Sequence, residues 1–237
     1  MAVTRGAALL VLAGGRGVRA GGPTPKQFVT DRRGCSVLAR CLMGARAAGD
    51  WGRIVVVAPE SDVTTAEEHL RVAGLTGATV VPGGEHRLDS LLDGLAQLDP
   101  VASPLCVIHD GTRPFTPSAL FRDVLDAVSR DGVDAAWPAA APASAVLTVA
   151  EPVPRALRSQ DLLIVSTPIA VRTEVVRRIV TGQSDSDSAV VPLLIRGGAR
   201  WVSVPDSPLN FKVTTPADLR DTVALMDAEA RPVGGPS

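Results

Sequence analysis

Ile54-Val55-Val56-Val57 is an unbroken run of β-branched residues at the centre of an expected strand, 53–58. A strand without polar alternation is buried on both faces, which is typical of a parallel sheet between two helix layers. Similar apolar runs alternate along the chain with amphipathic stretches of helical period. The sequence therefore predicts an α/β protein with a single doubly wound, mostly parallel sheet.

The positions of the expected elements follow from this alternation. Strands are expected at 7–13, 53–58, 79–81, 105–109, 135–140, 146–150, 201–205 and 211–214, and helices at 36–48, 62–73, 87–98, 117–130, 172–181, 187–195 and 216–230. The stretch 138–161 is rich in proline and alanine, and we expect it to leave the sheet as an arm. Because no linker divides the chain, residues 1–237 are expected to form one domain.

The bulk charge and hydropathy limit the classes of partner. A formal net charge of -1 creates no general field that would attract nucleic acid or an anionic membrane. The apolar stretch 7–13 is too short to span a bilayer and lacks a signal-cleavage site. We therefore expect a cytoplasmic protein that binds phosphate, if at all, through locally placed cations.

The two lysines of the chain stand out among its basic residues. The sequence has 22 arginines but only Lys26 and Lys212, and both lie in motif-like segments. A lysine ammonium is a compact point charge that the planar guanidinium of arginine does not reproduce. We interpret both lysines as catalytic.

A glycine-rich loop, Gly14-Gly15-Arg16-Gly17-Val18-Arg19-Ala20-Gly21-Gly22-Pro23-Thr24-Pro25-Lys26, follows the first expected strand. Five glycines in nine residues let the backbone approach an anion and point its N–H groups toward phosphate oxygens. Arg19 and Lys26 add side-chain charge to this cradle.

Three phosphate-binding loops are compatible with so many glycines. A P-loop requires Gly-x4-Gly-Lys-Ser/Thr, which the chain does not contain. A dinucleotide fingerprint, as in NAD-type dehydrogenases, is partly met by Gly15-x-Gly17-x-x-Ala20, but the Pro23 and Pro25 that follow break the helix which that motif opens. A long open loop around a nucleoside triphosphate explains both the length and the terminal Pro-Lys pair.

Three later segments carry polar residues at expected strand ends. They are Gly83-Gly84-Glu85-His86-Arg87-Leu88-Asp89-Ser90, His109-Asp110-Gly111-Thr112-Arg113-Pro114 and Pro208-Leu209-Asn210-Phe211-Lys212-Val213-Thr214-Thr215-Pro216. The carboxyl ends of strands in an open α/β sheet face the ligand crevice, which puts Asp110 where a magnesium ligand would lie.

Together with the glycine-rich loop, these segments resemble the 2-C-methyl-D-erythritol 4-phosphate cytidylyltransferase family and its ribitol-phosphate cytidylyltransferase relatives. The resemblance spans nearly the whole chain. It implies transfer of a cytidylyl group from CTP to a polyol phosphate, with Mg²⁺ as cofactor, pyrophosphate as product and an arm-mediated homodimer. A phosphate acceptor already carries an anionic oxygen, so no general base is needed, and we expect His86 and His109 to be structural.

The resemblance also implies roles for particular residues. Arg19 and Lys26 would stabilise the transition state at the α-phosphorus, Ser90 would contact the cytosine and ribose, and Asp110 would hold magnesium. The implied nucleotide-binding residues are Ala13, Gly14, Gly15, Gly17, Gly83, Ser90 and Asp110; the implied residues around the acceptor phosphate are Arg113, Thr167, Arg158 and Lys212.

The acceptor half departs from the family pattern. The expected Thr-Pro-Gln reads Thr167-Pro168-Ile169, Arg158 is one position out of register, and 142–148 lacks most of the expected charged and hydroxyl residues. Methylerythritol phosphate is the best named acceptor. A different polyol or sugar phosphate, or a non-catalytic CTP-binding paralogue, are the alternatives.

Overall fold

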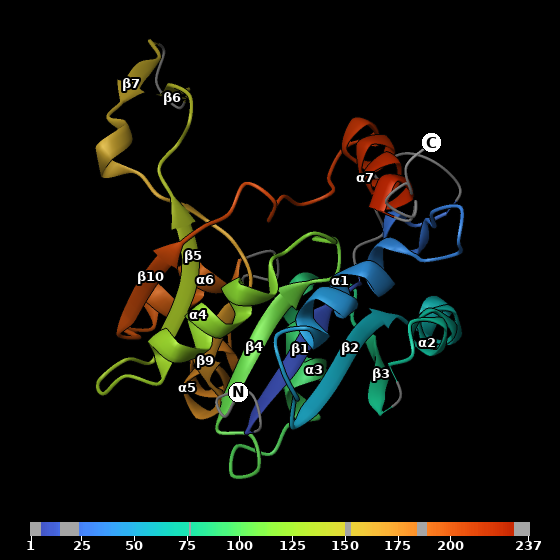
Figure 1. Ribbon diagram of the computed structural model, residues 1–237. Coiled ribbons are helices and arrows are strands. Elements are labelled where there is room, and N and C mark those ends of the chain that lie inside the picture. Colours follow the sequence, from blue (N-terminus) through green and yellow to red (C-terminus); the bar gives the residue numbers. More distant parts are fainter. Residues whose placement is uncertain (1–5, 15–23, 76, 150–152, 184–188, 230–237) are drawn as a thin grey trace.

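The computed structural model describes residues 6–14, 24–75, 77–149, 153–183 and 189–229, and its centre is an eight-stranded sheet (Figure 1). The strand order is β10-β5-β9-β4-β1-β2-β3, with β8 paired to β5. The strands are β1 (Ala7–Leu12), β2 (Arg53–Pro59), β3 (Ala78–Gly83), β4 (Leu105–Asp110), β5 (Ala135–Ala140), β6 (Val146–Thr148), β7 (Arg155–Leu157), β8 (Ile164–Val165), β9 (Ile169–Arg172) and β10 (Trp201–Pro205). The helices are α1 (Val37–Arg46), α2 (Val63–Val72), α3 (Arg87–Ala96), α4 (Ser118–Val128), α5 (Thr173–Val180), α6 (Val190–Arg196) and α7 (Pro216–Glu229), with short 3₁₀ turns η1 (Lys26–Phe28), η2 (Glu60–Asp62) and η3 (Ser159–Asp161).

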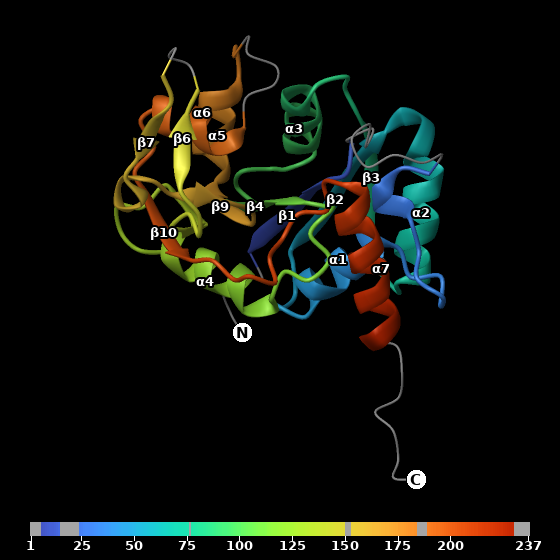
Figure 2. The same cartoon turned by 90° about the horizontal axis from the view of Figure 1, so that it is seen from above.

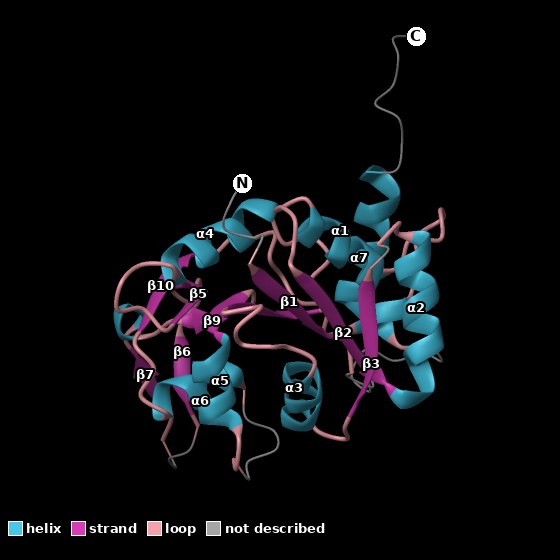
Figure 3. Ribbon diagram, turned by 90° about the horizontal axis from the view of Figure 1, so that it is seen from below, coloured by secondary structure: helices cyan, strands magenta, loops and turns pink. Residues whose placement is uncertain are grey.

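Helices cover both faces of the sheet, as Figures 2 and 3 show. All six residues of β1 are buried, because alternate side chains of a strand point to opposite faces and each face meets a helix layer. Leu9 and Val11 belong to the core formed with α1, α2 and α4. Leu10 and Leu12 belong to the core formed with α3, α5 and α6. The predicted doubly wound α/β fold is confirmed.

Strand β9 runs against its neighbours. It pairs antiparallel with both β4 and β5, whereas β4, β1, β2 and β3 are parallel to one another. The chain therefore enters β9 at the edge of the sheet where the parallel strands end. The segment that precedes β9, Ser166 to Pro168, lies at that edge.

The proline- and alanine-rich stretch forms a projecting arm with its own two-stranded sheet, β6 against β7 (Figure 1). The predicted start of the arm at residue 138 is wrong, because Pro138 and Ala139 pair with β10 in the central sheet. The described arm begins only after Ala140.

The expected strand 211–214 is also wrong, since these residues form an irregular segment before α7. Val213 is fully buried with Val37 of α1 and Met226 of α7, and its backbone N–H donates to the Thr112 carbonyl. None of the described helices combines the length and apolar composition that crossing a membrane requires.

Candidate active site

Four parallel strands end side by side and define the edge of the sheet that carries the site. Strands β1, β2, β3 and β4 are neighbours in the order β4-β1-β2-β3, so the residues that follow them converge. Because β9 is reversed, Thr167 joins the same edge from the opposite chain direction. The irregular segment before α7 reaches it as well, since Lys212 contacts Asp110 at the end of β4.

Asp110 lies at the centre of a cluster of cations. Its Oδ1 accepts a 2.8 Å hydrogen bond from Arg87 Nη2, and its Oδ2 accepts one of 3.0 Å from Lys212 Nζ. Arg113 Nε lies 3.5 Å from Oδ2. The Asp110 side chain is only 6% exposed. One buried carboxylate thus faces three cations, and this excess of positive charge suits the binding of a further anion.

The protonation state of Asp110 follows from the same contacts. Burial alone would raise the pKa of its carboxyl group, but the charges of Arg87, Lys212 and Arg113 outweigh burial and hold the pKa well below its usual range. Asp110 is therefore ionised throughout the physiological pH range. Its charge in turn holds three cations that come from α3, from the loop after β4 and from the segment before α7.

Thr167 completes this cluster from the reversed strand. Its Oγ1 accepts a 3.1 Å hydrogen bond from the Asp110 backbone N–H, and the residue is only 4% exposed. A hydroxyl group can accept and donate at once, so the Thr167 hydrogen can serve a ligand oxygen. The structure thus brings together Asp110, Arg113, Thr167 and Lys212, four predicted site residues that come from three separate segments of the sequence.

Lys26 and Gln27 anchor the far end of the glycine-rich loop. Lys26 Nζ donates a 2.7 Å hydrogen bond to the Val213 carbonyl, and Gln27 Nε2 donates one of 2.8 Å to the Ala13 carbonyl. The far end of the loop is thereby joined to Ala13, just after β1 where the loop begins, and to the segment that carries Lys212. The predicted residues Gly15, Gly17 and Arg19 lie outside the described residues.

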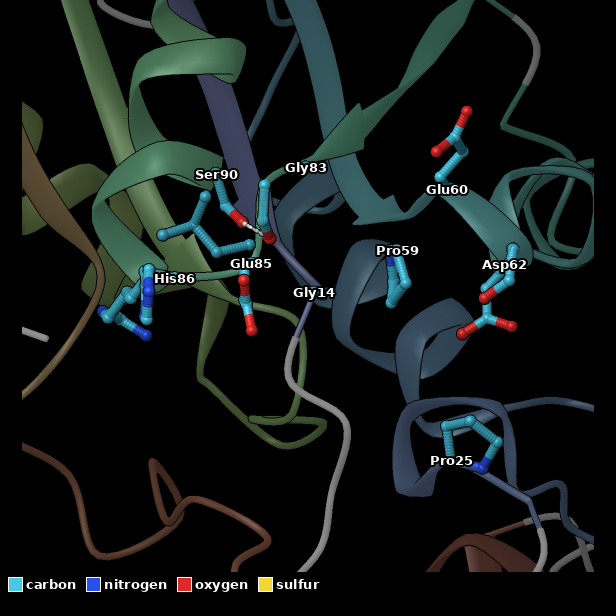
Figure 4. A pocket seen from close by; sticks show the side chains of 13 residues that line it. Gly14, Pro25, Pro59, Glu60, Asp62, Gly83, Glu85, His86 and Ser90 are labelled. Atoms are coloured by element: carbon cyan, nitrogen blue, oxygen red, sulfur yellow. Dashed lines mark hydrogen bonds between the residues drawn. The ribbon is translucent and has the colours of Figure 1, made fainter. Parts of the chain in front are cut away.

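A cavity of about 950 Å³ adjoins the cluster (Figure 4). Gly14, Gly83, Ser90 and Arg87 line it beside the sheet, and Arg87 also reaches Asp110. Opposite them lies the turn after β2, with Pro59, Glu60, Ser61 and Asp62. Arg87 therefore links the cavity to the cation cluster.

Glycine is required where this cavity meets the sheet. A Cβ at Gly83 would lie 2.6 Å from Ser90 Oγ and 2.7 Å from Val57 Cγ1, and one at Gly14 would lie 3.2 Å from Ser90 Oγ. The missing side chains leave both backbones close to the Ser90 hydroxyl, which is 5% exposed. This wall of the cavity is therefore made of backbone and a single hydroxyl group.

Several of these residues had no predicted role. Arg87 lies inside the motif 83–90, but its pairing with Asp110, 23 positions later, gives no local signal in the sequence. Glu60 and Asp62 directly follow a strand, so the rule that ligands bind at strand ends could have found them.

Arg158 is a predicted site residue that lies away from the cluster. It lies on the arm, with its side chain 70% exposed and its Nε 3.3 Å from the Asp161 carboxylate. Among the described residues, no contact joins it to Asp110, Arg113 or Thr167.

His109 is buried behind the cluster and belongs to the core. Burial lowers the pKa of its imidazole to about 3, so the ring is neutral. The ring packs edge-on against Phe121, and Nε2 lies 3.3 Å from the Thr116 hydroxyl. A neutral, fully buried imidazole is a packing group rather than an acid or a base for a ligand.

The carboxylate of Asp110 was tested as a ligand for the expected magnesium ion. Magnesium usually binds one or two carboxylates together with substrate phosphates and water. Oδ1 accepts from Arg87 alone, which leaves it a further lone pair. Among the described residues, no three histidine, cysteine or acidic side chains gather as a metal-ligand set. The residues present therefore fit a metal that is bound chiefly through substrate phosphates.

Comparisons with known proteins identify the relatives of this chain. The family model for 2-C-methyl-D-erythritol 4-phosphate cytidylyltransferase matches residues 7–228. The enzyme of that name from Saccharopolyspora erythraea is 34% identical over 222 residues, which cover 92% of this chain and 97% of the relative. The one from Rhodococcus jostii is 34% identical over 223 residues, which cover 93% and 95%.

A solved structure supports the fold independently. The 4-diphosphocytidyl-2C-methyl-D-erythritol synthase of Anaerococcus prevotii superimposes with a TM-score of 0.77 at 20% identity, covering 94% of this chain and 99% of that one. With a family model that spans almost the entire chain and relatives of this similarity, the chain belongs to the 2-C-methyl-D-erythritol 4-phosphate cytidylyltransferase family.

Proposed function

We propose that this protein transfers the cytidylyl group of CTP to 2-C-methyl-D-erythritol 4-phosphate and releases pyrophosphate, a step in isoprenoid precursor synthesis. The observation that carries the proposal is the cluster of three cations around Asp110 beside a glycine-lined cavity. Two anionic substrates must meet in this reaction, and an excess of fixed positive charge offsets their repulsion. Both substrates are cytoplasmic metabolites, and we assign the enzyme to that compartment.

The cavity is the proposed site of the nucleoside. Ala13, Gly14 and Gly83 would offer backbone to the cytosine and ribose, and the Ser90 hydroxyl would hydrogen-bond to them. Arg87 and Asp110 stand where the cavity meets the cluster. Gly15, Gly17 and Arg19 would wrap the triphosphate from the glycine-rich loop.

The acceptor phosphate is proposed to bind at the cluster, held by Arg113, Lys212 and the Thr167 hydroxyl. One of its oxygens attacks the α-phosphorus of CTP, forming a new P–O–P linkage. The bond from the α-phosphorus to the bridging oxygen breaks, and pyrophosphate carries away the electron pair. Arg19 and Lys26 would neutralise charge that develops on the oxygens of the α-phosphate. Positioning and charge stabilisation then supply the catalysis.

We propose magnesium as the cofactor, with Asp110 as its protein ligand. When bound, the ion would neutralise phosphate charge and orient the triphosphate. The side chains of this protein would hold the acceptor phosphate in one orientation, and they keep the Lys26 ammonium close to the nucleotide loop.

A different polyol or sugar phosphate is the second candidate acceptor. Ile169, which stands where the family pattern has glutamine, is 3% exposed and packs in the core of the sheet rather than facing a ligand. Arg158 pairs with Asp161 on the arm. These two departures leave fewer polar groups for the hydroxyls of methylerythritol phosphate.

The arm is proposed to mediate a homodimer. Leu147, Val149 and Val153 are 55%, 82% and 72% exposed, and Leu163 and Ile164, where the chain returns to the central sheet, are 54% and 55% exposed. A second copy of the arm would cover such an apolar strip. Dimerisation would also give Arg158 a route to the site of the partner chain.

A pyrophosphate-release assay tests the proposal. Purified protein is incubated with CTP and magnesium against methylerythritol phosphate, ribitol phosphate and a panel of sugar phosphates. We expect turnover with methylerythritol phosphate, and the highest kcat/KM identifies the acceptor. A protein that binds CTP in calorimetry but releases no pyrophosphate with any acceptor would instead be a non-catalytic paralogue.

A further inference from the structure

A buried asparagine, Asn210, joins the loops that surround the cation cluster. It is 3% exposed, and its Nδ2 lies 2.8 Å from the Thr167 carbonyl, 2.9 Å from Ser166 Oγ and 2.8 Å from Asp206 Oδ1. Its Oδ1 accepts a 2.7 Å hydrogen bond from the Thr116 hydroxyl. Three chain segments therefore meet on one amide side chain: the one with Thr116, the one with Ser166 and Thr167, and the one from Asp206 to Asn210 itself.

The partners fix the orientation of that amide. A carbonyl oxygen can only accept, so the group facing Thr167 must be the NH₂ of Asn210. The Thr116 hydrogen is then given to Oδ1, and His109 Nε2 is the donor that remains for the Thr116 oxygen. Both ends of the Asn210 amide are thus specified, which neither aspartate nor leucine could reproduce.

Its backbone extends the same connection to Arg113. The carbonyl oxygen of Asn210 accepts a hydrogen bond from Arg113 Nη1, and Lys212 lies two residues further along the chain. Thr167, held through its carbonyl by Asn210, accepts from the Asp110 backbone N–H through its hydroxyl. The three groups that the proposed function assigns to the acceptor phosphate are therefore all attached to Asn210 or adjoin it.

We propose that Asn210 is a positioning residue for the acceptor-phosphate site. It fixes the positions of Arg113, Thr167 and Lys212 relative to one another and does not itself contact the substrate. This inference rests on the proposed function, because the phosphate is what the three groups bind together. Losing the amide removes its hydrogen bonds to Ser166, Thr167 and Asp206, so that the Thr167 loop is held to the segment that carries Lys212 by fewer contacts, among them the hydrogen bond from Ser166 Oγ to Asp206 Oδ2. The cavity side of the site keeps its own contacts.

The test separates the two substrates kinetically. For Asn210→Ala, we expect kcat/KM for the best acceptor of the panel to fall about 100-fold, since small displacements of positioning groups have effects of that order. We expect the KM for CTP to stay within about twofold, because no contact of Asn210 reaches the residues that line the cavity. An equal change in both KM values, or none, would overturn the inference.

Thr173→Val is the matched control. The Thr173 hydroxyl donates to the Ser103 carbonyl at 2.6 Å in an equally buried network at the start of α5. This variant should lose a comparable amount of thermal stability and leave both KM values unchanged. A rise in acceptor KM in Thr173→Val would mean that the assay reports destabilisation rather than positioning.

A double variant tests whether Asn210 acts through Arg113. If it does, Asn210→Ala combined with Arg113→Ala should be little worse than Arg113→Ala alone, whereas independent roles would multiply the two losses. If Asn210→Ala does not fold, Thr116→Val removes the hydrogen bond to Asn210 Oδ1, together with the Thr116 contacts to the Arg113 carbonyl and to His109 Nε2, and should raise the acceptor KM selectively. Turnover in the unaltered protein with normal kinetics in Thr116→Val and Asn210→Ala defeats this inference alone. Absence of turnover in the unaltered protein defeats the proposed function as well.

Discussion

Lys26 and Val213, 187 residues apart in the chain, are joined by a 2.7 Å hydrogen bond from the lysine ammonium to the valine carbonyl. Val213 directly follows Lys212, so this contact brings the two lysines of the sequence to one place. Lys26 ends the glycine-rich loop, and Lys212 binds the carboxylate of Asp110. The proposed triphosphate loop and the proposed acceptor site are therefore physically linked in this structure.

The chemical requirement at Lys26 can be tested by an arginine substitution. We expect Lys26→Arg to lose nearly as much turnover as Lys26→Ala, on the order of 100-fold, because a planar guanidinium does not replace a point charge. Pyrophosphate release measures both variants. Arg71→Lys, at an exposed position paired with Glu68, is the control and should keep full activity. Full activity in Lys26→Arg would refute the requirement for an ammonium group.

Asp110 is expected to support both stability and catalysis. Asp110→Asn leaves three neighbouring cations without their counter-charge, so the free energy of unfolding should fall by about 3 kcal/mol. Chemical denaturation without magnesium measures this loss. Glu68→Gln, which removes an exposed carboxylate, is the control and should change the free energy of unfolding far less, because solvent screens this ion pair.

The proposed metal role of Asp110 has a separate readout. Asp110→Asn should need a higher magnesium concentration for half-maximal turnover than the unaltered protein. An unchanged magnesium dependence would contradict the metal assignment and leave the ion-pair role intact.

A side chain at position 83 is predicted to weaken the binding of CTP in the cavity. In Gly83→Ala, the added methyl group would press on the Ser90 hydroxyl and on Val57. We expect the KM for CTP to rise about tenfold, since overpacking of this kind costs 1–3 kcal/mol, with little change in the acceptor KM. Steady-state kinetics with each substrate varied in turn measures this. Gly6→Ala, where a Cβ would have nothing within 4 Å, should behave as the unaltered protein.

The exposed apolar side chains of the arm and of β8 predict the oligomeric state. A Leu147→Asp, Ile164→Asp double variant puts charges on a surface that a second copy would cover, so the dimer should dissociate. Light scattering after size-exclusion chromatography measures the mass. Val101→Asp, at a position that is 89% exposed outside the arm, should leave the mass unchanged. A monomer in the unaltered protein would remove the basis for this prediction.

Asp134 predicts a pH-dependent contribution to stability. Hydrogen bonds from the Arg200 guanidinium lower the pKa of the Asp134 carboxyl from 3.8 to about 2. A lowered pKa in the folded state stabilises above the unfolded value near 3.8, and this contribution disappears as the pH falls toward 2. Because Arg200 is 67% exposed and screened by solvent, Asp134→Asn should cost only about 1 kcal/mol at pH 7. Urea denaturation at pH 7 and pH 2.5 should show a difference between the two proteins that shrinks at the lower pH.

The helices and strands that could be predicted from the sequence are those whose own residues show a clear pattern of apolar positions. The expected strand 135–140 agrees with β5, and 53–58 differs from β2 by one residue, because apolar runs flanked by turn residues mark such strands. Strand β9 was missed, since its four residues run directly into α5 and leave no turn between them. The segment 211–214 alternates apolar and polar residues like a strand, but Phe211 packs on Phe115 and Val213 on Met226 instead of on a sheet.

The candidate site was predictable where a motif carries the residue. Asp110, Arg113 and Lys212 were selected before the structure brought their side chains together. Arg87 and Asn210 were not given roles, because their functions come from contacts with distant segments and not from their sequence neighbours. Ion pairs and hydrogen bonds between distant loops produce no periodic pattern in the sequence, so they become visible only in the folded structure.

The reversed direction of β9 has a consequence for locating ligand sites in proteins of this architecture. In a sheet whose strands are all parallel, the side chains that bind ligands come from the residues just after the C-terminal end of each strand. The residues that precede the strands lie at the opposite edge of the sheet. Because β9 is antiparallel to β4, the segment that precedes β9 and carries Thr167 lies at the same edge as the residues that follow the parallel strands. A survey confined to residues downstream of strands would overlook such a contributor, so upstream neighbours of any antiparallel member merit equal scrutiny.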